Sequence, residues 1–217
     1  MPGVHGTALL AYVLTSIASV STAEARIPIG APLQEKGFER IAHRGGVTVF
    51  KHKHSDTIRL AADARFKASV DEVRRALLDY EGQVGTIDRL SEARVLGRSG
   101  RSLLVYQRLN LPWISDRDFN LKVVWWRQGG TTWIAYRALS RGGVPETDAV
   151  RVKRHTGSWQ LKPVNGGRET QVRFQVEIDL GGWLPMWLAR AGSGKEVPGL
   201  FASIDSMIQR SRYRSQR

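Results

Sequence analysis

Residues 171–178 read Gln171-Val-Arg-Phe-Gln-Val-Glu-Ile178, and the chain then runs through Asp179-Leu180-Gly181-Gly182 into Trp183-Leu-Pro-Met-Trp-Leu-Ala-Arg190. Apolar and polar side chains alternate in the first stretch, which predicts a β-strand with one dry and one wet face. After the glycine pair the spacing becomes that of an amphipathic helix, with Pro185 near the first turn, where its missing N–H is tolerated. We therefore predict an α+β fold in which a curved sheet closes on a C-terminal helix around an apolar ligand.

Two large indoles, Trp183 and Trp187, stand one turn apart on this helix, beside Leu188. Aromatic side chains commonly line apolar clefts, so we expect them to face a ligand. The alternative is that they only cap the hydrophobic core. Further along, the apolar spacing of residues 196–208 predicts that helical structure continues, with Gly192-Ser-Gly194 and Pro198 as places for a kink or break.

The rest of the chain is dominated by strand patterns separated by Gly-containing turns, which is typical of antiparallel hairpins. One helix is predicted over residues 70–80, because Ser69 and Glu72 form a capping-box pattern before an apolar stripe. Residues 31–38 are expected to cover a sheet edge or one end of the domain. The predicted strands are 46–53, 57–66, 93–99, 101–110, 117–127, 131–140, 150–162 and 170–178.

The N-terminus carries an apolar run over residues 8–20 that is too short to span a bilayer, followed by Ala23-Glu24-Ala25, a typical cleavage pattern. Residues 1–25 are therefore predicted to be a signal peptide, and the protein periplasmic or otherwise exported. No Lys or Arg precedes the apolar run, so an uncleaved membrane anchor is the alternative. The remainder divides into one folded domain over residues 26–212 and a basic tail over 213–217.

The formal net charge is +13 over 217 residues. Cleavage after Ala25 would remove Glu24 and no Lys or Arg, so the charge would rise by one, to +14. In an exported protein such a charge favours an anionic membrane surface as partner, although it can also serve solubility alone. No basic run with interleaved aromatics indicates nucleic-acid binding. The chain has no cysteine, which excludes disulfides and Cys-based metal sites.

A second landmark is Leu111-Pro-Trp-Ile-Ser-Asp-Arg-Asp-Phe119, and with Gly157-Ser-Trp-Gln-Leu-Lys-Pro163 and Ile178-Asp-Leu-Gly-Gly-Trp-Leu-Pro185 it resembles the START (steroidogenic acute regulatory protein-related lipid transfer) family, in particular its exported bacterial members. The likeness runs from about Gly37 to Met207. It implies a helix-grip fold, in which a curved antiparallel sheet wraps a long C-terminal helix around an internal apolar cavity for one lipid-like molecule. It also implies no catalytic residues, no cofactor and no metal.

In the strand that begins at Arg117, alternate residues share one face, and this face is the better cavity wall. Arg117 would be a cation near an apolar interior, and we expect it to pair with Asp116 or Asp118, with ligand contact as the alternative. The family resemblance implies that sterol carriers can place a further charged residue deeper along this strand. Here the deeper positions Leu121, Val123 and Trp125 are apolar, which argues against selectivity for sterols. The expected ligand contacts are Tyr106, Arg117, Phe119, Leu121, Val123, Trp125, Phe174, Val176, Trp183, Trp187, Leu188 and Phe201.

The predicted function is non-enzymatic binding, and transfer between membranes, of a lipid or other apolar molecule by a monomer. One alternative is a polyketide cyclase or aromatase that uses polar groups such as Tyr106, Tyr136 and Arg117 in the same cavity. Another is an envelope interaction module with a vestigial cavity. The segment 141–148 resembles a mobile loop over the cavity mouth but equally an ordinary surface turn. His52 and His54 share a strand face, and with His43 or His155 they could bind a metal, but a solvated basic strand is the favoured interpretation.

Overall fold

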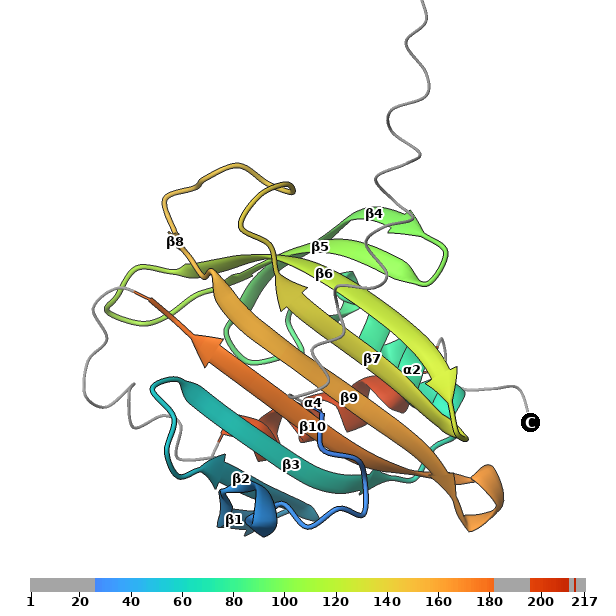
Figure 1. Cartoon of the computed structure of the whole chain (residues 1–217). Coiled ribbons are helices and arrows are strands. Elements are labelled where there is room, and N and C mark those ends of the chain that lie inside the picture. The colour runs from blue at the N-terminus through green and yellow to red at the C-terminus, as the bar shows by residue number, and fades with distance from the viewer. Residues whose placement is uncertain (1–25, 182–195, 211–212, 214–217) are drawn as a thin grey trace, which may run out of the picture.

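The computed structural model describes residues 26–181, 196–210 and 213 (Figure 1). Its main feature is one strongly curved sheet in the order β1-β2-β3-β10-β9-β7-β6-β5-β4, in which neighbouring strands are antiparallel, and a short β8 pairs in parallel with β6. This is the helix-grip fold that was predicted. The strands are β1 Phe38–Arg44, β2 Val47–His52, β3 Ile58–Phe66, β4 Leu90–Ser99, β5 Ser102–Leu109, β6 Arg117–Gln128, β7 Thr131–Ala138, β8 Val150–Arg151, β9 Arg154–Val164 and β10 Glu169–Asp179.

Helices α2 (Val70–Leu78) and α4 (Glu196–Ile208) pack together on the same side of the sheet (Figure 1). We call the sheet face toward these helices the inner face and the opposite one the outer face. Helix α2 begins with the predicted capping box, in which Ser69 and Glu72 exchange side-chain to backbone hydrogen bonds. Three short 3-10 turns, η3 (Gln34–Lys36), η4 (Glu81–Gln83) and η5 (Asn165–Gly167), complete the described elements. None of the described helices has the length and hydropathy needed to cross a membrane.

The alternation along β10 is reproduced in the structure. Val172 and Phe174 are buried on the inner face with α2 and α4, whereas Gln175 and Arg173 lie on the outer face. Helix α4 buries the predicted stripe, because Val197, Phe201, Ile204, Met207 and Ile208 are all in the core. Burial of this apolar stripe is what attaches the helix to the sheet.

The outer face is covered in part by the N-terminal segment, residues 26–37, which passes in front of the sheet in Figure 1. Ile27 and Leu33 form a small second core there with Phe38, Phe50 and Ala61 of β1–β3. Arg173 fastens the segment: its guanidinium donates to the carbonyl oxygens of Pro28 (2.6 Å) and Ala31 (2.8 Å) and forms a two-point ion pair with Asp63 (2.6 and 2.7 Å).

Most predicted element ends are shifted by one to three residues, and three larger features of the predicted organisation also differ. Strand β1 was missed because a bulge between Arg40 and Ala42 interrupts its alternation. The predicted strand 150–162 is two strands, since β8 pairs with β6 and β9 pairs with β7 and β10. The folded domain extends past 212, because Tyr213 is buried and its hydroxyl donates to Asp79, while its carbonyl oxygen accepts from Arg75 (2.6 Å).

Candidate functional site

The inner wall of the predicted site is formed by β6 and its neighbours. Phe119, Leu121 and Val123 lie side by side on the inner face and belong to the buried core. Trp125, at the far end of the same row, is only partly buried, and its ring is within cation–π distance of two guanidinium groups, those of Arg74 (4.5 Å) and Arg101 (4.8 Å). The apolar wall therefore ends at Trp125 in a basic rim.

An aromatic cluster joins the middle of the sheet to α4. The ring of Trp159 lies 4.3 Å from that of Phe174 and 5.4 Å from that of Phe201, and Phe201 stacks on Phe66 at 5.7 Å. Val176, two residues beyond Phe174, is only partly buried against this core. Phe174, Val176 and Phe201 were expected to contact a ligand, and the structure brings all three to the inner face. Trp159 and Phe66 were missed, although both stand on the dry face of a predicted alternating strand.

A cleft of about 650 Å³ opens between α4 and the β2–β3 side of the sheet. Val47, Ala64 and Phe66 line it from the inner face, and Pro198 and Phe201 line it from the helix. Its lining also includes the charged residues Arg44, Arg65, Lys67 and Asp205. Phe201 thus links the aromatic cluster to this cleft. The predicted contacts Trp183, Trp187 and Leu188 lie outside the described residues.

Arg117 is almost completely buried but forms no ion pair with Asp116 or Asp118, so the predicted pairing is wrong. Its guanidinium instead donates to the backbone carbonyl oxygens of Ser115, Leu180 (3.1 Å) and Gly181 (3.2 Å). Burial lowers the pKa of Arg117. Carbonyl dipoles solvate a buried cation that lacks a counter-ion. Arg117 therefore fixes the residues that follow β10 to the start of β6.

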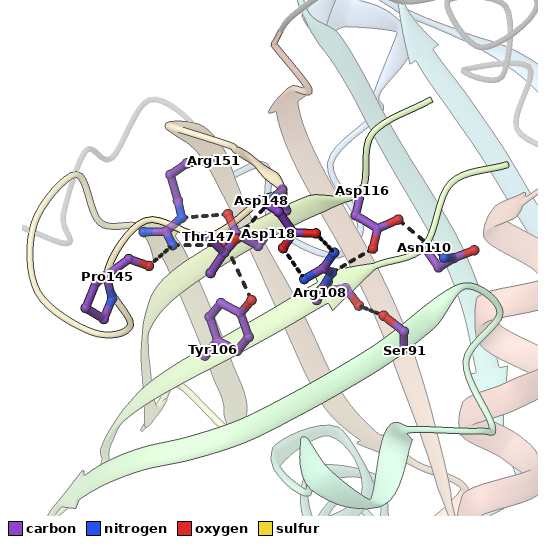
Figure 2. Close-up of polar contacts among 11 residues, drawn as sticks. Ser91, Tyr106, Arg108, Asn110, Asp116, Asp118, Pro145, Thr147, Asp148 and Arg151 are labelled. Atoms are coloured by element: carbon purple, nitrogen blue, oxygen red, sulfur yellow. Dashed lines mark hydrogen bonds and ion pairs between the residues drawn. The ribbon is translucent and has the colours of Figure 1, made fainter. Parts of the chain in front are cut away.

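Tyr106 lies on the outer face and not on the wall with Phe119, which corrects its place among the expected ligand contacts. In the β5–β6 register Tyr106 stands opposite Asn120, and its hydroxyl donates to Asp118 (3.4 Å). Figure 2 shows Tyr106, Asp118 and Arg151 pointing toward one another on this face. Arg151 forms a two-point ion pair with Asp118 (2.6 and 3.0 Å).

The same cluster holds the segment between β7 and β8, residues 139–149. The side-chain amide of Asn120 exchanges two hydrogen bonds with the backbone of Val144 (2.8 and 3.0 Å), and Thr147 donates to Asp118 (2.8 Å). Arg108 bridges Asp116 (2.6 Å) and Asp148 (2.8 Å). Glycine is needed at position 143, because φ is +85° and a Cβ would lie 2.4 Å from Asn120 Oδ1. The structure therefore agrees with a surface turn fixed to the outer face.

Three polar rings lie on the inner side of the sheet. His155 of β9 packs edge-on against Phe119 (4.9 Å) and Tyr136 (5.0 Å). Burial lowers the pKa of His155 to about 4, and burial together with the neighbouring Tyr80 phenol raises the pKa of Tyr136. Burial likewise raises the pKa of Tyr80. At neutral pH this polar spot is therefore uncharged.

Two of the histidines considered as metal ligands, His52 and His155, lie on opposite faces of the sheet. His155 faces inward, whereas His52 packs against Phe38 on the outer face. Among the described residues, no group of three or more His, Asp and Glu side chains is placed to hold a metal ion. His155 and Tyr136 instead stand out as polar groups in an apolar wall, a role for His155 that the sequence did not indicate.

A family model described as START domain matches residues 77–214, more than half of the chain. An uncharacterized protein of Pseudomonas aeruginosa is 29% identical over 127 residues, which are 58% of this chain and 62% of the relative, so the match spans about three fifths of that protein.

Three solved structures have similar folds. The STAR-related lipid transfer protein (fragment 25–204) of Xanthomonas axonopodis is 20% identical with a TM-score of 0.73, and the match covers 80% of this chain and 99% of that one. Human StAR-related lipid transfer protein 5 is 14% identical with a TM-score of 0.75, over 93% and 98% of the two chains. The Zhui aromatase/cyclase of a Streptomyces species is 13% identical with a TM-score of 0.54, over 72% and 96%.

Proposed function

The chain belongs to the START domain family, and from this premise we propose that it binds one lipid or other apolar molecule between its sheet and α4 and carries it between membranes without changing it chemically. The supporting observation is the aromatic cluster of Trp159, Phe174 and Phe201, which lies between sheet and helix and of which Phe201 also lines the cleft along α4. Apolar ligands are bound in clefts with such a lining.

Mass spectrometry of organic extracts from the purified protein tests this proposal. We expect an intact lipid in stoichiometric amount. The competing function is the cyclase or aromatase chemistry named in one of the structural relatives. A protein that is purified empty and converts a polyketide-like substrate would overturn transfer in favour of that enzyme.

Export is the second part of the proposal. Ile27 is already attached to the sheet, because its N–H donates to Gln175 Oε1 (2.9 Å) and its carbonyl oxygen accepts from Gln160 Nε2 (2.8 Å). Cleavage after Ala25 would leave both contacts intact. We expect N-terminal sequencing of the protein from the cell envelope to begin at Arg26. Recovery of the intact chain with Met1 from the cytosol would contradict export.

We also propose that the protein contacts an anionic membrane surface through the loop between β5 and β6. Trp113 in this loop is 90% exposed, and indoles favour the interface between membrane and water. The net positive charge adds an attraction that salt screens over about 10 Å at ~0.1 M.

Replacing Trp113 with Asn is expected to weaken binding to anionic vesicles about three- to tenfold, because an apolar ring no longer enters the interface. Asn tolerates the positive φ of +68° at this position, so the free energy of unfolding should change by less than about 0.5 kcal/mol. Vesicle co-sedimentation and a urea melt measure the two quantities. Val84→Asn, at another partly exposed apolar residue, is the matched control. Equal losses in both variants would contradict a specific role for Trp113.

A further inference from the structure

The inner wall contains one place where hydrogen-bonding groups lack partners. His155 Nδ1 is buried without a hydrogen bond, and among the described residues none bonds to His155 Nε2 or to the hydroxyl of Tyr136. Both side chains are half-buried, so each keeps some accessible surface. His155 Nδ1 is thus the buried atom without a partner, while Nε2 and the Tyr136 hydroxyl, which are not among the buried unsatisfied atoms, are the two groups of this spot that can still bond to a ligand.

The position of Tyr136 is fixed by Gly157 on the neighbouring strand. A Cβ at residue 157 would lie 2.3 Å from the Tyr136 hydroxyl oxygen, so the phenol lies directly across the glycine. His155 and Trp159 are four residues apart on the same face of β9, which is about 13 Å along the strand. The polar pair thus stands at one end of the inner wall and the aromatic cluster near its middle, a spacing that matches an apolar chain with one polar end.

The hydrogen-bond requirements decide what that polar end must offer. A buried N–H group without an acceptor is rarer in proteins than a buried acceptor without a donor. The proton of the neutral imidazole is therefore expected on the accessible Nε2, which leaves the enclosed Nδ1 as the unprotonated acceptor. Nε2 is then a donor that seeks an oxygen. The pKa of His155, lowered by burial to about 4, keeps the ring uncharged at neutral pH, and the Arg117 guanidinium already donates to the backbone carbonyls of Ser115, Leu180 and Gly181. A carboxylate or phosphate at this spot would therefore face an uncharged imidazole and an uncharged phenol, which offset its desolvation less well than a cation would.

We propose, building on the lipid-binding function above, that the ligand carries an uncharged oxygen at one end, a hydroxyl or a carbonyl, and that His155 Nε2 donates a hydrogen bond to it beside the hydroxyl of Tyr136. The ligand class is accordingly that of fatty alcohols, acylglycerols or other neutral lipids. Anionic lipids with a free carboxylate or phosphate at that end are disfavoured.

Displacement of the neutral dye Nile red from the full-length protein at pH 7 tests this class with three probes of one chain length: 1-dodecanol, dodecane and dodecanoate. The wild type should bind dodecanol about three- to tenfold more tightly than dodecane, the effect of one net hydrogen bond, and more tightly than dodecanoate. His155→Phe keeps the ring packing and should abolish the preference for dodecanol over dodecane. His155→Gln keeps a side-chain donor and should retain part of the preference.

Three results would overturn the assignment while leaving apolar ligand binding intact. The wild type could bind dodecanol and dodecane equally or bind dodecanoate most tightly, or His155→Phe could keep the full preference for dodecanol. Failure of the wild type to bind Nile red and all three probes would overturn the proposed function itself. If His155→Phe does not fold, ¹⁵N NMR of the wild-type imidazole decides the matter. Its Nε2 signal should shift with dodecanol and not with dodecane, and an equal response to both probes would overturn the proposal.

Discussion

Replacement of Asp118 by alanine is expected to lower the free energy of unfolding by about 3–5 kcal/mol, the typical result when one partner of a buried ion pair is removed. Asp118 has no exposed surface, and it accepts hydrogen bonds from Arg151, Thr147 and Tyr106. Its loss leaves the Arg151 guanidinium without its carboxylate and frees the segment 139–149 from the outer face. Urea unfolding monitored by circular dichroism measures the loss.

The double variant Asp118→Ala/Arg151→Met is the matched control. Removing both charges should recover much of the lost stability, because a buried ion pair is often no better than apolar side chains of similar size. If the single variant loses less than about 1 kcal/mol, the ion pair does not hold this face together.

Protonation of Asp118 at low pH should also lower the stability of the fold. Burial opposes ionisation of Asp118, but the hydrogen bonds from Arg151 and Thr147 and the charge of Arg151 outweigh it, so its pKa lies below the usual value. Because the pKa is depressed in the folded state, the stability from Asp118 is complete above the unfolded pKa of about 3.9 and is lost as the pH falls through the folded pKa. The Asp118→Ala variant should show a correspondingly smaller loss of stability below about pH 4.

Replacement of Phe201 by alanine is expected to cost about 3–5 kcal/mol, because the ring is buried and its removal leaves a cavity in the centre of the aromatic cluster. Phe201 contacts Phe66, Trp159 and Phe174, so its loss weakens the attachment of α4 to the sheet. Thermal or urea unfolding of the purified variant gives the change.

Ser206→Ala, on the exposed side of the same helix, is the matched control and should change stability by less than about 0.5 kcal/mol. Nile red binding measured on the same variant distinguishes a role of Phe201 in ligand contact from a role in the structural core. If Phe201→Ala keeps its stability but loses Nile red binding, the ring is a ligand contact and not part of the structural core.

The sequence alone determined the elements whose signals are local. The alternation of residues 171–178 predicted a strand with an inner apolar face, and Ser69 with Glu72 predicted the start of α2; the structure confirms both. The order of the three resembling motifs was enough to predict the helix-grip fold. These elements can be predicted from the sequence because helix capping and strand alternation depend on neighbouring residues and not on distant parts of the chain.

Which face a side chain takes was not always decided locally. Strand β5 has apolar residues on both faces, with Leu103 and Val105 on one and Leu104 and Tyr106 on the other, so its own pattern does not orient Tyr106. Only the pairing of β5 with β6 places Tyr106 opposite Asn120, on the outer face. A shift of register by one residue would exchange the faces.

The partners of charged groups were also decided by the tertiary structure. Asp116 and Asp118 adjoin Arg117 in the sequence, but they pair with Arg108 and Arg151, which the sheet brings beside them. Adjacent residues of a strand point to opposite faces, so nearness in the sequence separates these side chains instead of joining them. The sequence therefore determined the strands, helices and family, while the register and curvature of the sheet decided which charges meet and why His155 and Tyr136 face the interior together.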